Sequence, residues 1–218
     1  MKTFLFLFTF AFYLLPFSLS SATVDKPKTY IQGRRMEILK KGEATEFTGG
    51  VTLTRENDFM SADRMVNYDK EGTTHAWGNV YLKRRDPVKG VLWEAWGDEG
   101  IYDSNVSSGT LWGKVIGEVR QSTPTAKLTR VWADRASYDP TNGSLSFVGP
   151  PATSGSRSRF MPPWPAGGDP RPRVVETDDE GVRDLWGDHV TYFEADRRVI
   201  AEGSVRANWK GAKNGAAR

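Results

Sequence analysis

Apolar and polar residues alternate around a glycine at five places along the chain. Residues 47–53 (FTGGVTL) and 76–82 (AWGNVYL) are the fullest copies, with apolar residues two places before the glycine and two and four places after it. Residues 111–115 (LWGKV) and 201–207 (AEGSVRA) repeat the pattern, and 147–149 (FVG) is a truncated copy. A period of two predicts β-strands with one buried and one solvated face. A glycine inside such a strand indicates a bulge or a sharp bend.

A second motif precedes each glycine strand. It is an aspartate with an aromatic residue four places later, as in 96–103 (WGDEGIYD), 132–139 (WADRASYD) and 186–193 (WGDHVTYF). In the looser copy 63–68 (DRMVNY) the tyrosine comes one place late, and 33–38 (GRRMEI) has Arg34 at the aspartate position. The repeated residues are Asp63, Asp98, Asp134, Asp188, Tyr68, Tyr102, Tyr138 and Tyr192. The two motifs together predict an all-β fold built from five strand-turn-strand units.

The repeated aspartates and tyrosines are interpreted as structural residues. A short carboxylate at a strand start can accept backbone N–H bonds from the adjoining turn. Aromatic side chains favour pleated, half-buried surfaces, although exposed ones could also stack on sugars. One aspartate per unit spreads the acids along the fold, whereas paired-carboxylate glycosidase chemistry needs two acids within about 10 Å.

The interval between the last two aspartates is longer than the others. Asp63 to Asp98 spans 35 residues and Asp98 to Asp134 spans 36, but Asp134 to Asp188 spans 54. The excess maps to a stretch that holds seven of the twelve prolines. Residues 150–183 are therefore predicted to be a Pro/Gly-rich loop insertion. Residues 210–218 (KGAKNGAAR) are predicted to be a frayed tail.

The N-terminus has the layout of a secretory signal peptide. Lys2 precedes an uncharged, mostly apolar run of 16 residues (4–19), and 20–22 (SSA) supplies small residues at a cleavage position after Ala22. The run is short for a membrane span, which needs about 20 residues. A signal peptide over 1–22 and a flexible segment over 23–30 are predicted, with retention as a membrane anchor as the alternative.

Composition narrows the chemistry. The chain has no cysteine and two histidines, so disulfides and thiolate metal sites are excluded, and no metal or cofactor is expected. No catalytic residues are assigned, because no nucleophile elbow or phosphate-binding loop is present. Without residues 1–22 the chain carries 29 basic and 27 acidic residues, interspersed rather than segregated. No nucleic-acid partner is therefore expected.

The paired motifs resemble those of the OstA-like family. Residues 45–82 and 186–207 carry the resemblance best, and it extends over a domain from 31 to 209 apart from the insertion. The family includes the periplasmic lipopolysaccharide-transport bridge protein LptA, the membrane-anchored LptC and the N-terminal domain of LptD. The resemblance implies an open, twisted β-jellyroll whose two sheets form a V around an apolar groove, and it implies no enzyme activity.

In that family the groove holds the acyl chains of lipid A. The resemblance implies a periplasmic bridge that carries lipopolysaccharide from the inner-membrane transporter towards the outer membrane, with like-folded partners and end-to-end homo-oligomers. The groove candidates are the apolar residues in phase with the glycines. They are Phe47, Val51, Leu53, Val80, Leu82, Leu111, Val115, Phe147 and Val205. In a closed sandwich the same residues would form a sealed core.

Two alternatives remain open at this point. If residues 1–22 are retained, an inner-membrane-anchored, LptC-like acceptor in the same export system is the better interpretation. The other alternative is a secreted structural or carbohydrate-binding β-repeat protein with a closed core.

Overall fold

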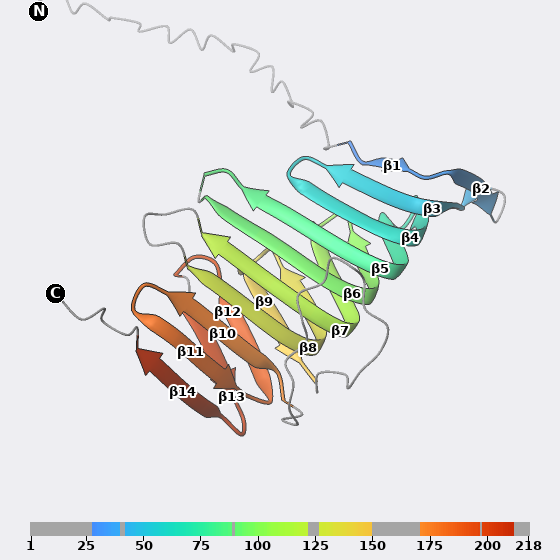
Figure 1. The fold of residues 1–218 in the computed structure, drawn as a ribbon. Coiled ribbons are helices and arrows are strands. Elements are labelled where there is room, and N and C mark those ends of the chain that lie inside the picture. The colour runs from blue at the N-terminus through green and yellow to red at the C-terminus, as the bar shows by residue number, and fades with distance from the viewer. Residues whose placement is uncertain are drawn as a thin grey trace, which may run out of the picture.

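The computed structural model describes residues 28–39, 42–88, 90–121, 127–149, 171–196 and 198–211. These residues form one 14-stranded antiparallel sheet (Figure 1). The strands are β1 (Tyr30–Gln32), β2 (Arg35–Leu39), β3 (Ala44–Arg55), β4 (Asp58–Tyr68), β5 (Thr73–Asp86), β6 (Val91–Asp103), β7 (Ser108–Gln121), β8 (Leu128–Asp139), β9 (Ser144–Val148), β10 (Arg173–Asp178), β11 (Gly181–Trp186), β12 (His189–Phe193), β13 (Arg198–Glu202) and β14 (Arg206–Gly211). The predicted all-β class is confirmed.

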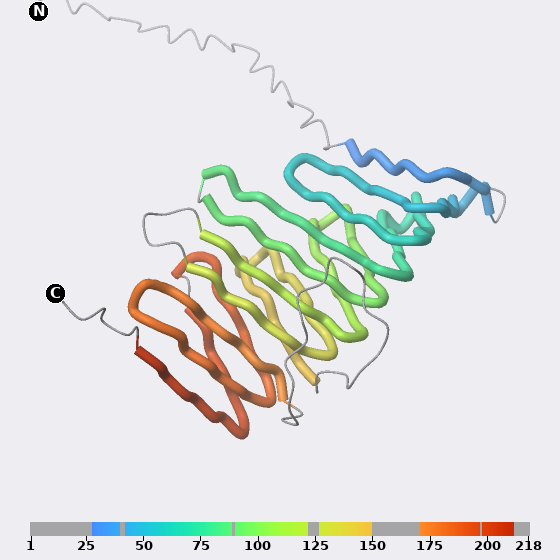
Figure 2. Tube along the Cα trace, in the orientation of Figure 1, coloured from blue at the N-terminus to red at the C-terminus, as the bar shows by residue number. Residues whose placement is uncertain are grey.

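The sheet folds into two walls because each long strand from β3 to β8 belongs to both. One half of β3 pairs with β1 and the other half with β2. Likewise, the first half of β8 pairs with β10 and the second half with β9. We call wall 1 the part that runs from β1 through β10 and β11 to β14. Wall 2 runs from β2 through β9 and β12 to β13 (Figure 2).

A row of β-bulges separates the two walls. At every step from β3 to β8 the register shifts, and the glycine strand has one residue more than its partner. Between β7 and β8, for example, Gly113 and Lys114 together face Asp134. A bulge bends its strand and increases the local twist. We call this row the seam, and it is where the repeated glycines and aspartates of the sequence meet.

The seam glycines leave room for acidic side chains. Gly113 has φ 76°, which favours glycine, and a Cβ added to it would lie 2.7 Å from Asp98 Oδ2. Gly149 faces Asp134 in the same way, at 2.9 Å from its Cβ, and in the first unit Gly49 faces Arg34. Asp188 accepts a hydrogen bond from the backbone N–H of Ser204, at 2.8 Å. The donor is thus the residue that follows the seam glycine Gly203, whereas the sequence predicted a donor in the turn next to the aspartate.

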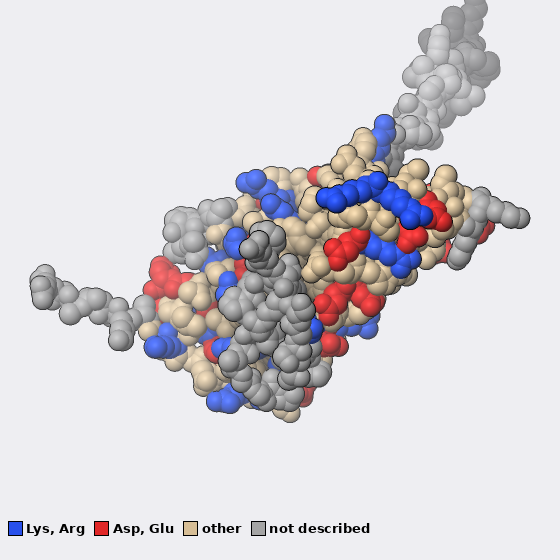
Figure 3. Space-filling view, turned by 45° about the vertical axis from the view of Figure 1, so that its right-hand side comes forward, with Lys and Arg blue, Asp and Glu red and all other residues tan. Residues whose placement is uncertain are grey.

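The interior lies between the walls. Alternate residues of both walls point inward and form a large buried cluster, which includes Val51, Met65, Val131 and Phe147, and a smaller one around Trp93. On the face seen in Figure 3, basic and acidic side chains both occur. The strand alternation predicted from sequence thus separates core from solvent.

Part of the predicted loop is sheet. The prediction of a loop over 150–183 is wrong for β10 and the start of β11, which pair with β8 and β14. Val174 is 1% exposed and its neighbours Arg173 and Val175 are half-buried, so this short segment buries enough to hold a place in wall 1. The prolines lie upstream and made the loop seem longer. Residues 150–170 lie outside the described residues.

The predicted ends need smaller corrections. Tyr30, placed in the flexible N-terminal segment, belongs to β1, and β14 extends through Gly211 into the predicted tail. Residues 1–27, which include the predicted signal peptide, and residues 212–218 lie outside the described residues. Within the described part of the chain, no helix has the length and apolarity to cross a membrane.

Replacing a seam glycine tests the bulge row. Gly113→Ala adds a Cβ that meets Asp98 and also strains the left-handed backbone. Gly50 has φ 74° and open space around it, so Gly50→Ala carries the backbone cost alone, about 1 kcal/mol. We expect Gly113→Ala to lower the free energy of unfolding, measured by urea denaturation, by about 2 kcal/mol more than Gly50→Ala. Equal losses for the two variants would contradict a seam held by this contact.

Candidate functional site

The interior contains an open chamber between the two walls. Its empty space is about 850 Å³, part of which is continuous with solvent. Its apolar lining comes from β3 to β9 and includes Leu53, Met60, Leu82, Ala95, Leu111, Leu145 and Phe147. An apolar lining favours a ligand with hydrocarbon chains.

The groove candidates differ in how close they lie to the chamber. Leu53, Leu82, Leu111 and Phe147 line the chamber. Val51, Val80 and Val115 lie deeper beside the seam and are 0% exposed, while Phe47 packs against the same cluster. Eight of the nine candidates are thus in or against one interior.

Val205 does not share this position. Its side chain is 49% exposed, and it lies in the connection between β13 of wall 2 and β14 of wall 1. The glycine pattern continues in sequence, but the strand does not continue across the seam here. The alternation that places the other candidates inside therefore fails at Val205.

The sequence did not indicate four chamber residues on β4, β6 and β9. Met60, Ala95 and Trp93 come from β4 and β6, and Leu145 comes from β9. Met60 and Trp93 stand at alternate positions of strands that contain the aspartate motif, so the same period of two could have identified them. The candidates predicted from the sequence all lie in the glycine half of each unit.

Polar side chains of both walls meet at the mouth of the chamber. The Tyr102 hydroxyl in wall 2 donates a hydrogen bond of 3.2 Å to Asp58 Oδ2 in wall 1. Arg55 donates to the backbone oxygen of Ser104, again from wall 1 to wall 2. The Arg84 guanidinium lies over the Tyr138 ring, 4.8 Å from its centroid. Two of the repeated tyrosines thus connect the walls.

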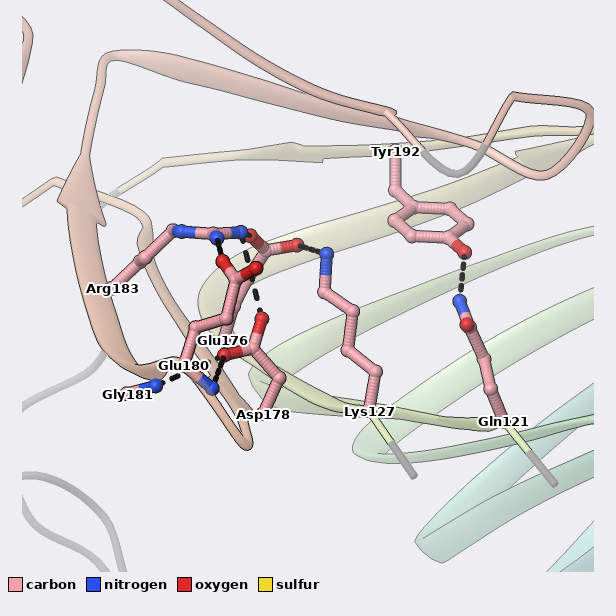
Figure 4. A network of polar contacts seen from close by, with 8 residues as sticks. All are labelled: Gln121, Lys127, Glu176, Asp178, Glu180, Gly181, Arg183 and Tyr192. Atoms are coloured by element: carbon pink, nitrogen blue, oxygen red, sulfur yellow. Dashed lines mark hydrogen bonds and ion pairs between the residues drawn. The ribbon is translucent and has the colours of Figure 1, made fainter. Parts of the chain in front are cut away.

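The other two repeated tyrosines have different surroundings. Tyr68 packs edge-on against His75, with ring centroids 5.2 Å apart, within wall 2. Tyr192 on β12 reaches across to wall 1, where its ring lies 4.9 Å from that of Trp93 and its hydroxyl accepts a 3.3 Å hydrogen bond from Gln121 (Figure 4). Tyr192 is 2% exposed, so the walls are in close contact at this point.

A charged rim extends the mouth along β10 and β11. Lys127 pairs with Glu176 at 2.6 Å, and Arg183 lies 3.6 Å from both Glu176 and Asp178 and 2.9 Å from Glu180 (Figure 4). The side chain of Glu180 is exposed and that of Arg183 is partly exposed, whereas the side chains of Lys127, Glu176 and Asp178 are mostly buried. The interior is therefore apolar in its depth and polar at its edge.

Burial perturbs the ionisable groups at the mouth. Burial raises the pKa of Asp58, and the nearby Arg84, the Tyr102 hydrogen bond and Arg55 only partly oppose this. Burial also raises the pKa of Tyr102, and the Asp58 charge adds to the effect. The carboxylate of Asp58 is thus incompletely compensated by its neighbours.

The described residues offer little for metal binding. No group of three or more His, Asp or Glu side chains among them is arranged to hold a metal ion. His75 lies between Tyr68 and Trp77, and His189 is within 3.5 Å of Thr191. What the interior presents is an apolar space with a polar mouth, an arrangement suited to holding an amphiphile.

Comparison with known proteins decides the family. Residues 30–152, more than half of the chain, match the family of LptA and the LptD N-terminal domain, described as an LPS transport protein. The chain belongs to this family. The family prediction from the repeats is confirmed, and so is the fold, an open, twisted, LptA-like β-jellyroll. The family consists of transport proteins and not of enzymes.

Among solved structures, the LptA-like chain is similar to LptH, the LptA-homologous periplasmic component of the lipopolysaccharide transport device of Pseudomonas aeruginosa. The two are 13% identical, with a TM-score of 0.48, and the similarity covers 68% of this chain and 94% of that chain. No curated protein matches the sequence.

The raised pKa of Asp58 gives a pH-dependent stability. The folded protein binds the Asp58 proton more tightly than the unfolded chain, so this stabilisation is present below the ordinary value of 3.8 and is lost as the pH rises through the folded pKa. Asp58→Asn cannot titrate. We therefore expect the free energy of unfolding of wild type relative to Asp58→Asn to fall as the pH rises from about 3 to 7.

Urea denaturation at several pH values measures this difference. Asp69→Asn, which removes an exposed carboxylate from the turn after β4, controls for the loss of an acid. A difference between wild type and Asp58→Asn that stays constant with pH would contradict the assignment.

Proposed function

We propose that this protein is a periplasmic, non-catalytic bridge that binds lipopolysaccharide and carries it from the inner-membrane transporter towards the outer membrane. The chamber between the walls carries the proposal. Each acyl CH₂ removed from water contributes about 0.8 kcal/mol, so the apolar lining of the chamber offsets part of the cost of moving lipid chains out of a membrane. Membership of a lipopolysaccharide transport family supports the choice of lipid.

The open side of the chamber supports transport over permanent storage. The chamber is connected to solvent, and its mouth is bounded by side chains and not by a closed barrel of strands. A ligand can therefore leave without breaking a backbone ladder. This geometry also argues against the structural alternative with a sealed core.

The ends of the walls favour like-folded partners. β1 and β2 at one end, and β13 and β14 at the other, each have a strand neighbour on one side only among the described residues. Tyr30, Met36 and Ile38 are exposed on the first pair, and Trp209 is 68% exposed on β14. Unpaired edges with exposed apolar side chains suit addition of strands from another chain. We propose end-to-end contacts with the like-folded family members of both membranes, or with further copies.

Removal of residues 1–22 after Ala22 belongs to the same proposal. If these residues are retained, the same groove would serve an anchored, LptC-like acceptor. The mass of the N-terminal peptide after export, measured together with membrane fractionation, separates the two roles.

A photocrosslinking probe tests lipid binding. Leu82 on β5 is half-buried and lines the chamber, whereas Arg85 on the same strand points to the outer face and is exposed. We expect a probe at Leu82 to crosslink to lipopolysaccharide in cells and a probe at Arg85 not to do so. Detection of lipopolysaccharide on the shifted protein band is the measurement, and equal crosslinking at both positions would contradict a lipid-lined chamber.

A charge at the N-terminal edge tests the end-to-end contact. Ile38→Lys places a cation on β2, where the side chain is 64% exposed. Val106→Lys is the matched control, because Val106 is 55% exposed in the turn between β6 and β7. We expect light scattering coupled to size exclusion to show concentration-dependent association of wild type and Val106→Lys, and at least a tenfold weaker association of Ile38→Lys. The same association in all three proteins would reject this edge as the contact.

A further inference from the structure

The inner face of wall 1 is layered in two rows. The deeper row crosses the strands through paired residues that are all apolar or glycine. Its members are Met60, Leu82, Ala95, Gly117, Val131, Val174 and Leu185. The next row toward the mouth is Asp58, Arg84, Trp93, Val119, Thr129, Glu176 and Arg183. A ligand whose chains lie on the deeper row would place its polar group at the second row.

Trp93 in the second row has an unused hydrogen-bond donor. The side chain lines the chamber and is 8% exposed, and its Nε1 hydrogen has no acceptor among the residues that the structure describes. A buried donor without an acceptor costs about 1–3 kcal/mol. The indole ring packs on Tyr192, but none of the described residues gives the nitrogen a polar partner. A bound ligand with an acceptor atom would supply one.

Arg84 stands directly beside Trp93. The two residues face each other across β5 and β6, so their Cβ atoms are about 5 Å apart on the same side of the sheet. Arg84 Nε lies 3.6 Å from Asp58 Oδ1, longer than a hydrogen bond. The remaining guanidinium surface stacks on Tyr138, and the side chain is 37% exposed. A cation and a neutral donor thus flank the mouth of the apolar chamber.

We propose that Arg84 and the Trp93 indole N–H bind the phosphate group of an amphiphile whose chains occupy the chamber. This inference rests on the proposed lipid-binding function and names the headgroup that the chamber selects. A guanidinium presents a planar fork that matches phosphate oxygens and retains its charge when partly buried. The indole N–H is a donor only and therefore suits an acceptor-rich anion.

Asp58 has a competing role at this position. Its carboxylate is the anion nearest to Arg84, and burial leaves it incompletely compensated. It therefore holds Arg84 near the mouth when no ligand is bound and opposes an incoming anion. Removal of its charge strengthens phosphate binding, which is opposite in sign to the effect of removing Arg84.

Two simple amphiphiles test the site. Dodecyl phosphate and dodecyl glucoside carry the same chain, and binding of each below its micelle concentration is measured by isothermal titration calorimetry. We expect the phosphate to bind more tightly, and Arg84→Gln to weaken it by about tenfold while leaving the glucoside unchanged. Arg85→Gln removes the same charge from the outer face and controls for general electrostatics.

Two further variants separate the contributions. Trp93→Phe keeps an aromatic ring and removes the unpaired donor, so we expect about fivefold weaker phosphate binding. Asp58→Asn should bind dodecyl phosphate several-fold more tightly than wild type. Melting temperatures of all variants distinguish lost binding from lost folding.

The outcomes separate this inference from the function on which it rests. Equal binding of the two amphiphiles, with Arg84→Gln indistinguishable from Arg85→Gln, would overturn the phosphate site and leave the lipid chamber intact. Binding of neither amphiphile would overturn both proposals. Binding of inorganic phosphate alone as tightly as dodecyl phosphate would also reject the site, because the chamber would then contribute nothing.

Discussion

The fold depends on the row of β-bulges that crosses the six strands from β3 to β8. At each seam position a glycine and its successor face a single residue of the next strand. An aspartate occupies the space that a Cβ would need on the later glycines, such as Gly78 and Gly113, and Arg34 occupies it at Gly49. The resulting bends are aligned, so the long strands turn together and one sheet becomes two walls. Without the alignment, the apolar faces of the strands would lie on one side of a flatter sheet, and no chamber would form between them.

The layered interior follows from the bend. Residues next to the seam, such as Val80 and Val115, are 0% exposed because the walls converge there. Farther from the seam the inward positions include Arg84, Trp93 and Thr129, and Trp93 packs on Tyr192 of the other wall. The same alternation that builds a core near the bend therefore builds a binding surface near the mouth. The cross-wall contacts of Tyr102 and Tyr192 add specific attachment points where the backbone supplies none.

The sequence was sufficient for much of this arrangement, for identifiable reasons. Alternation around the glycines predicted the strands, and the repeated Asp and Gly predicted a recurring bend, because both signals are local. Val205 was misplaced because periodicity within a strand cannot reveal that the chain crosses from one wall to the other. The strands β10 and β11 were missed because they are short, lack a clear alternation of apolar and polar residues and follow a proline-rich stretch. Arg84 lies two residues beyond Leu82 and on its face, but only the pairing of β5 with β6 reveals that Trp93 is its neighbour.

The chain path changes character after β8, and this has a mechanical consequence. Up to that strand, each long strand contributes backbone to both walls, so the angle between them is set by continuous main chain. Beyond it, wall 1 continues as β10, β11 and β14, while wall 2 continues separately as β9, β12 and β13. The spacing of the walls in this part is determined by side chains such as Tyr192 and Gln121. The distance between the walls is therefore set by continuous backbone from β3 to β8, and by side-chain packing toward β13 and β14.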